Sequence, residues 1–309
     1  METLIISTLL LFAAYSFASS GSLLSEKSGV ANISIEGNMI MGSILYCVFS
    51  DLLIGPLEDT SGEYVIPIIS VIIAGILTMI FSSLFSIIVL RFKSDQIIVG
   101  TGINLLSPAL ATFIGFLYFG TSSSASLPYI PVLTQGNNIY IYPIIFLILA
   151  IILLLFLGFY INKTRSGLRI KAAGENPYAL ETSGISVDKT RRKMLLFAGL
   201  LSGMAGAIWV QTIVGGFHWT VFGAGFMAVG IVIFSQWRVG GLFFGSLIIG
   251  FLTALTQHYL EIEAIKDVEG GLLLLLQISP YLIPLIVLIF SKASSMPKKL
   301  GEPFKKDER

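Results

Sequence analysis

Nine stretches of nearly continuous apolar residues divide the chain, each about as long as a membrane-crossing helix. Such a helix needs about 20 mostly apolar residues. The runs are continuous rather than alternating, which predicts helices and argues against a membrane barrel. The seventh run is short and bounded by glycines, so we expect a broken or re-entrant helix there. The predicted spans are residues 3–20, 37–55, 65–90, 97–118, 140–162, 194–213, 221–236, 239–258 and 271–291.

The composition agrees with a membrane protein. Of the 309 residues, 55% are hydrophobic and 12% are charged, against about 25% charged in a typical soluble domain. This excludes an ordinary soluble enzyme, a disordered protein and a nucleic-acid binder. The expected fold is all-α, a polytopic membrane bundle of about nine spans (eight to ten), forming one domain over 1–291 with a basic, partly disordered tail at 292–309.

Lysine and arginine positions predict how the spans are oriented. Basic residues concentrate in 163–193 and in the tail, and Arg91 and Lys93 lie between the third and fourth spans. These places should be cytoplasmic, because cytoplasmic loops carry an excess of Lys and Arg. The opposite connections, 56–64, 119–139 and 259–270, contain few basic residues or none. An odd number of spans then puts the N-terminus outside and the C-terminus in the cytoplasm.

Motifs for enzymatic chemistry are missing from the sequence. It has no phosphate-binding loop of the G-x-x-x-x-G-K-[ST] type, no H-E-x-x-H motif and no G-x-S-x-G motif. His218 and His258 are far apart in sequence, and no Cys/His cluster suits a metal ion. The spans also contain few ionisable residues, whereas proton- or ion-driven carriers usually place some there. A passive or externally driven transporter is therefore favoured over an ion-coupled one.

The segment 24–39 is polar although it directly joins two spans. Irregular polar backbone at membrane depth is tolerated where it is buried in protein or lines a watery cavity. One interpretation is a pathway or gate lined by Asn32, Glu36 and Asn38. The other is a short cytoplasmic turn, in which Glu36 stabilises the next helix by about 0.3–1 kcal/mol because it lies at the N-terminus of that helix.

The segment 163–193 is longer than a simple turn between spans requires. Asn176 followed by Pro177 fits a helix N-cap and first position, and Gly184 fits a helix end, so a short helix is predicted at roughly 177–183. A positive-inside anchor would explain the basic ends of the segment. The capped middle favours a docking element for a soluble partner.

The region 199–245 contains small-residue spacings, such as Gly199-x-x-x-Gly203, that suit close helix packing. At the outer end of the sixth span, Gln211, His218 and Trp219 could meet a ligand. They are equally explained as a polar loop with an interfacial aromatic residue.

Four blocks in the same regions resemble a known family, the bacterial ABC-transporter permeases for nucleosides and simple sugars. The resemblance runs nearly end to end, and the order and spacing of the blocks make it specific. The blocks are SEKSGVANISIEGNMIMGS (25–43), DQIIVGTGINLLSPAL (95–110), TRSGLRIKAAGENPYALETSGISVDKTR (164–191) and GFMAVGIVIFSQWRVGGLFFGSLIIG (225–250).

This resemblance implies a permease domain over 1–291 in a bacterial cytoplasmic membrane. It implies a second permease subunit in a heterodimer, a cytoplasmic ATPase that carries the ATP and Mg, and an extracellular solute-binding lipoprotein. No cofactor, metal or nucleic acid is expected on this chain. The implied ATPase-coupling residues are Gly174, Glu175, Asn176, Pro177, Tyr178, Ala179 and Gly184. The candidate translocation pathway comprises Asn32, Glu36, Asn38, Asn104 and Gln211.

Two positions depart from the pattern of that family. Pro177-Tyr178-Ala179 replaces the family's acid-Ala-Ala, which bears on the coupling to the ATPase. Asn38 stands where the nucleoside branch usually has Met, and could adjust selectivity.

Three functions remain open from the sequence. A nucleoside importer is favoured, because a base stacks on flat apolar or aromatic surfaces and the spans are rich in these. A pentose or other sugar permease would need denser hydroxyl partners. An ion-coupled secondary transporter is the alternative from another class.

Overall fold

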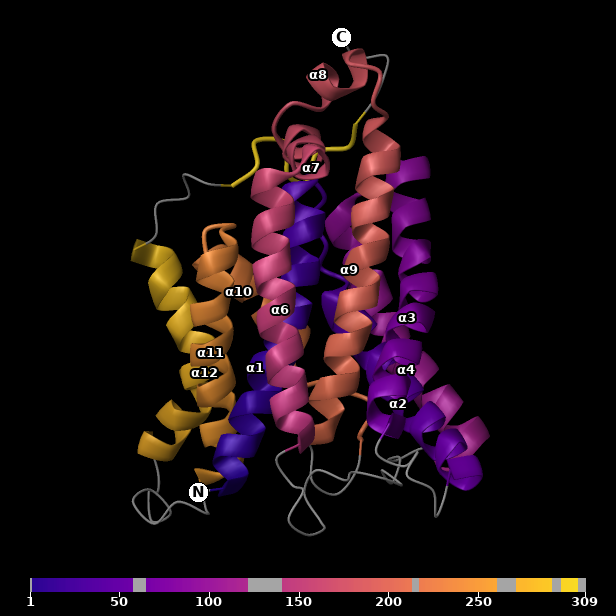
Figure 1. Cartoon of the computed structure of the whole chain (residues 1–309), viewed down its shortest axis with the longest axis vertical. Coiled ribbons are helices and arrows are strands. Elements are labelled where there is room, and N and C mark those ends of the chain that lie inside the picture. The colour runs from indigo at the N-terminus through magenta and orange to yellow at the C-terminus, as the bar shows by residue number, and fades with distance from the viewer. Residues whose placement is uncertain are drawn as a thin grey trace.

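The computed structural model describes residues 2–57, 65–121, 141–212, 217–259, 271–290 and 296–304. The regular elements within these ranges are all helices (Figure 1). They are α1 (Glu2–Lys27), α2 (Ile35–Leu57), α3 (Ile66–Arg91), α4 (Gln96–Phe119), α6 (Ile141–Lys163), α7 (Arg165–Glu175), α8 (Pro177–Thr182), α9 (Val187–Trp209), the 3-10 turn η3 (Val210–Thr212), α10 (Ala224–Phe234), α11 (Val239–Gln257) and α12 (Gly271–Phe290).

The helical membrane bundle predicted from the sequence is confirmed. Each predicted span contains one helix, and seven helices in the described ranges are long and apolar enough to cross a membrane. The short seventh element is also confirmed: α10 has 11 residues, a length of about 16 Å, roughly half of a hydrocarbon core of about 30 Å. Its N-cap is Gly223, whose φ of 82° suits glycine.

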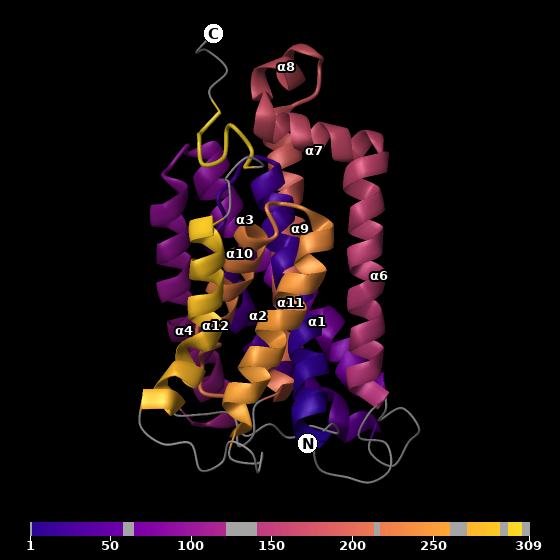
Figure 2. The same ribbon diagram turned by 90° about the vertical axis from the view of Figure 1, so that its left-hand side faces the viewer.

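The two ends of the bundle differ (Figures 1 and 2). The start of α1 lies at one end, whereas α7, α8 and the tail residues 296–304 lie at the other. Most of the connections 56–64, 119–139 and 259–270, which were predicted to be external, fall outside the described residues, as do 292–295 and 305–309 of the tail.

Helices α1 and α9 form the centre of the bundle. In their most apolar windows 83% and 78% of the residues are buried, against 22% in α4 and 28% in α6. The small residues of α9 lie where its neighbours approach most closely. A Cβ on Gly203 would meet the Thr78 side chain of α3, and a Cβ on Gly206 would meet the Met39 backbone of α2. The small-residue faces therefore do serve close helix packing.

The first helix continues further than the sequence suggested. The expected polar connection after residue 20 is helical as far as Lys27, so only 28–34 is irregular. Buried Glu26 explains the difference, because it accepts hydrogen bonds from Ser22 on its own helix and from the Trp237 indole just beyond α10. A polar face of α1 is thus satisfied inside the protein rather than in solvent.

Candidate functional site

The irregular segment 28–34 descends from the α7 end of the bundle along the first half of α4. The amide of Ala31 donates to the Gln96 side chain at 2.7 Å. Further along, Asn104 donates from Nδ2 to the Ile33 carbonyl at 3.0 Å and accepts from the Gly37 amide at 2.8 Å. Two polar side chains of α4 therefore satisfy backbone groups that the interrupted helix leaves unpaired. As a result α2 begins inside the bundle rather than at its end.

Asn32 shapes the turn that leads into α2. Its Oδ1 accepts hydrogen bonds from the Ser34 amide at 3.1 Å and the Ser34 hydroxyl at 2.6 Å. Such an Asx turn favours the change of chain direction that starts the helix. The side chain is buried, with 2% of its surface exposed.

Glu36 lies in the first turn of α2 but binds the N-terminus of a different helix. Its two carboxylate oxygens accept from the amides of Gly223 at 2.9 Å and Gly225 at 2.7 Å, at the start of α10. A Cβ on Gly225 would meet the Glu36 backbone, so a side chain there would push the two segments apart. A carboxylate at a helix N-terminus satisfies orphan amides and complements the helix dipole. Glu36 therefore joins the N-termini of α2 and α10 inside the bundle.

Two further pathway candidates have buried polar atoms without hydrogen-bond partners among the described residues. Neither side-chain atom of fully buried Asn38 has a partner. Gln211, on η3, donates to the Ala207 carbonyl at 2.9 Å, but its Oε1 accepts no hydrogen bond from the described residues. Buried polar atoms without partners are rare and usually mark a strained, water-filled or functional place.

His218 and Trp219, which were also candidates to meet a ligand at the outer end of the sixth span, lie in different environments. Trp219 is buried and lies against Gly115 of α4, whereas His218 is exposed. Asn32, Glu36, Asn38 and Asn104 thus gather around the start of α2, and Gln211 follows the end of α9.

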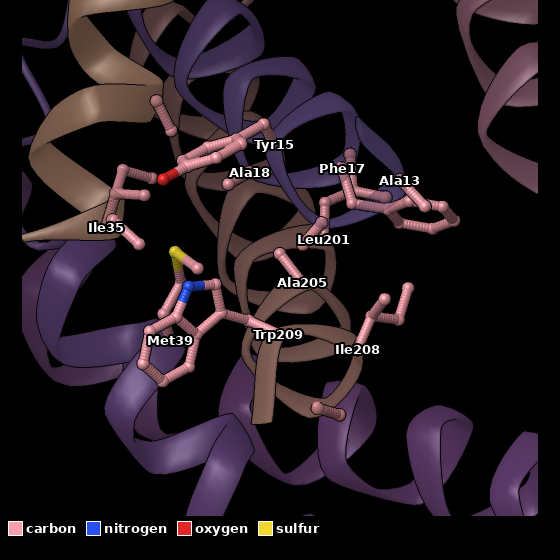
Figure 3. Close-up of a cluster of buried hydrophobic side chains, with 14 of the residues drawn as sticks. Ala13, Tyr15, Phe17, Ala18, Ile35, Met39, Leu201, Ala205, Ile208 and Trp209 are labelled. Carbon is pink, nitrogen blue, oxygen red and sulfur yellow. The ribbon is translucent and has the colours of Figure 1, made fainter. Parts of the chain in front are cut away.

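A cavity of about 330 Å³ lies between α1, the end of α9, the start of α10, α11 and α12. Figure 3 shows two of its residues, Tyr15 and Trp209, facing the same region as Ile35 and Met39 at the start of α2. The sequence analysis missed this cavity. The cavity is lined by Tyr15, Trp209, Val221, Phe222, Met227, Thr253, Thr256, Gln257, Gln277, Pro280 and Tyr281.

The short helix predicted in 163–193 is present as α8. Asn176 is its N-cap and accepts from the Ala179 amide at 3.1 Å, Pro177 is its first residue, and Gly184 follows it with a φ of 83°. Helix α7 was not predicted. Its signal is Thr164, an N-cap that accepts from the Gly167 amide at 3.0 Å.

The implied coupling residues divide into an exposed and a buried set. Gly174 and Pro177 are buried, and a Cβ on Gly174 would meet the Lys27 carbonyl at the end of α1. The exposed set, accessible to a soluble partner, comprises Glu175, Asn176, Tyr178, Ala179 and Gly184.

Arg191, counted in the sequence only as part of a basic cluster, is almost completely buried at 1% exposure. Its guanidinium donates to three main-chain carbonyls from three segments: Ser28 at 3.1 Å, Ala173 at 3.2 Å and Glu302 at 3.0 Å. The planar group with five donors suits this task, which lysine could not reproduce. Arg191 therefore ties the segment after α1, helix α7 and the tail to α9.

Part of the basic tail, residues 296–304, packs against α7, α8 and α9. The Lys299 amide donates to the Gly174 carbonyl at 2.9 Å, and the Phe304 ring is 3% exposed and lies 5.3 Å from the ring of Tyr178. The Glu302 carboxylate, 2.8 Å from the Lys299 ammonium, raises the lysine pKa above its ordinary value. We call α7, α8 and residues 296–304 together the coupling surface.

Comparison with known proteins identifies the family. The family model described as branched-chain amino acid transport system / permease component matches residues 4–278. The chain belongs to this family.

The similarity to individual relatives covers most or all of this permease. It is 32% identical to the nucleoside ABC transporter permease protein NupC of Lactococcus lactis subsp. cremoris, over 92% of this chain and 91% of that protein. It is 30% identical to the guanosine ABC transporter permease protein NupQ of Bacillus subtilis, over 100% of this chain and 98% of the other. A putative glucose ABC transporter permease protein, TsgC13 of Haloferax volcanii, is 26% identical over 82% of this chain and 76% of its own length. No solved structure gives a significant match.

The permease is therefore a multi-pass membrane transport component of an ABC transporter and not an enzyme. Permeases of this kind work with an ATPase and a binding protein. This division of labour agrees with the lack of a phosphate-binding loop in the sequence.

Proposed function

We propose that this permease is the transmembrane subunit of an ATP-driven importer of nucleosides. The similarity that carries the proposal is the match, over 92% or more of the chain, to permeases named for nucleoside and guanosine transport. The aromatic and amide lining of the cavity beside α10 supports the same class of cargo.

The coupling surface would receive the movement of the ATPase. Tyr178 and Ala179 are exposed on α8, and the Tyr178 ring contacts Phe304, which is buried beneath it. Through Arg191 the surface is connected to residue 28, where the irregular segment leading to α2 begins. Movement of α8 would thereby bias the positions of α2 and α10, which Glu36 holds together.

The candidate pathway residues take distinct roles in this mechanism. Asn32 and Asn104 hold the backbone around the start of α2. Glu36 binds α10 and sets its position. Asn38 and Gln211 have unpaired buried atoms that cargo or water could satisfy during transport.

The remaining partners follow from the family. The permease would pair with a second, different permease in the cytoplasmic membrane of a bacterium, with ATP and Mg on the ATPase and cargo delivered by an extracellular lipoprotein. Its coupling surface and C-terminus would face the cytoplasm, in agreement with the basic residues of 163–193, and its N-terminus would lie outside.

Uptake by proteoliposomes containing the whole importer tests the proposal. Radiolabelled guanosine, uridine and ribose are offered with and without internal ATP. In one variant Asn176-Pro177-Tyr178 is replaced by Gly-Ser-Gly, and in the control Thr101→Ala changes an exposed residue of α4 outside the coupling surface.

We expect ATP-dependent uptake of nucleosides that the triple replacement abolishes and Thr101→Ala preserves. Uptake of ribose without nucleosides would identify a sugar permease instead. Uptake that persists without ATP or ATPase would refute the ABC mechanism in favour of an ion-coupled carrier.

A further inference from the structure

Polar residues form one stripe on each of two otherwise apolar helices beside the cavity. On α11, Thr253, Thr256 and Gln257 have the i, i+3, i+4 spacing that places side chains on one helix face. On α12, Gln277 and Tyr281 are four residues apart. All five line the cavity. The Thr253 and Thr256 hydroxyls donate to carbonyls of α11 itself. The amides of Gln257 and Gln277 suit a polar or wet occupant between the helices, because lipid cannot satisfy such groups.

Four aromatic residues, Tyr15, Trp209, Phe222 and Tyr281, also line the cavity. Trp209 and Phe222 have ring centroids 6.1 Å apart at an interplanar angle of 46°. Tyr281 donates from its hydroxyl to the Phe222 carbonyl at 3.0 Å, which fixes its ring beside them. Tyr15, on α1, hydrogen-bonds to Thr253 of α11 at 3.3 Å. Flat rings from several elements therefore surround one space.

One donor of this wall has no partner. The indole Nε1 of Trp209 makes no hydrogen bond among the described residues, although only 3% of the side chain is exposed. A buried indole N–H usually has an acceptor. Its lack of a partner indicates that a ligand or water atom completes the site.

The lining also restricts the charge of the occupant. Among the residues that the structure describes around the cavity, no lining side chain is an acid, a base or a histidine. Charged ligands are disfavoured, because a buried charge requires a partner. A neutral heterocycle can stack on the rings and hydrogen-bond to the amides at the same time. The cavity volume of about 330 Å³ lies within the range of small-molecule sites, about 300–1,000 Å³.

The position of the cavity suits an early step of import. Gln257 ends α11, and the adjacent His258 hydrogen-bonds at 2.8 Å to Ser7, near the start of α1. The Gln257 side of the cavity thus lies near the end of the bundle opposite the coupling surface. Phe222, which also lines the cavity, is next to Gly223, whose amide binds Glu36. An occupant would lie against the α2–α10 junction.

We propose that this cavity is an outward-side subsite for the nucleobase of the cargo. The rings of Trp209 and Tyr281 stack on the base, and the amides of Gln257 and Gln277 hydrogen-bond to its edge. The subsite rests on the proposed function, since it assumes that the cargo carries a base.

Transport and ATP hydrolysis measured on the same reconstituted importer test the subsite. The variants are Trp209→Leu, Trp209→Phe and Tyr281→Leu. The matched control is Phe251→Leu, which changes an exposed aromatic residue of α11 outside the cavity. Guanosine uptake at saturating cargo and the ATPase rate stimulated by loaded binding protein are compared for each.

We expect Trp209→Leu and Tyr281→Leu to lower guanosine uptake at least about five-fold, equivalent to about 1 kcal/mol, with ATPase rates within about two-fold of wild type. Trp209→Phe retains a ring, so its guanosine uptake should lie between those of wild type and Trp209→Leu. Unchanged uptake, or uptake and ATPase activity that fall together, would overturn the subsite, the latter indicating a structural role. A wild-type importer without nucleoside uptake would overturn the proposed function as well.

Photolabelling provides a measurement on the unmodified permease. The importer in nanodiscs is irradiated with 8-azidoguanosine, and the labelled peptides are identified by mass spectrometry. We expect label on α11, on α12 or at the end of α9, with competition by excess guanosine. Competed label confined to other helices would overturn the assignment.

Discussion

Removal of the Glu36 carboxylate should release α10 from α2. The two amides that it binds, on Gly223 and Gly225, lie 2.9 and 2.7 Å from its oxygens. A hydrogen bond to a charged group contributes about 1.5–3 kcal/mol. Glu36→Gln keeps one acceptor and should lower the free energy of unfolding by about 1.5–3 kcal/mol. Glu36→Ala removes both and should lower it by about 3–6 kcal/mol.

Unfolding of the purified permease by SDS in mixed micelles, followed by circular dichroism, measures these differences. Glu2→Gln is the matched control, because Glu2 also lies in a first helical turn but is exposed. The control should change the free energy of unfolding by less than about 0.5 kcal/mol. The reasoning would be refuted if Glu36→Ala matched the control, or if Gln and Ala were equally destabilising.

Three other changes test the packing around the site. Arg191→Met leaves three carbonyls without their donor and should lower the free energy of unfolding by about 3 kcal/mol or more; a loss below 1 kcal/mol, roughly one hydrogen bond, would contradict this. Phe304→Ala should release the tail and speed tryptic cleavage after Lys299 about ten-fold, with unchanged cleavage as the contrary result. Gly206→Val should push α9 from Met39 and reduce the yield of monodisperse permease, unlike Gly240→Val, whose Cβ meets open space.

Features that depend on neighbouring residues were predictable from the sequence. The spans follow from the length of the apolar runs. Helix α8 follows from Asn176 and Pro177 at its start and Gly184 after its end, because caps act within a few residues of the chain. The short α10 follows from its flanking glycines.

Features that depend on distant partners were not predictable. Glu36 and Gly225 are 189 residues apart, and Arg191 and Glu302 are 111 apart. Local chemistry made Glu36 a candidate for its own helix and Arg191 one cation in a basic cluster. Only the folded bundle shows which amides and carbonyls these side chains meet. The cavity was missed because its lining comes from five separate parts of the chain.

The contacts of the tail determine how late during synthesis of the permease the coupling surface can form. Residues 299–304 are the last described part of the chain, yet they bind Gly174, Gly29 and Arg191, which leave the ribosome far earlier. Every membrane helix in the described ranges precedes them in the chain. The coupling surface is therefore completed only after residues 299–304 have been synthesised. A chain that stops before Lys299 would leave the Gly174 carbonyl and the Arg191 guanidinium without these partners, so the coupling surface of a truncated permease would be incomplete.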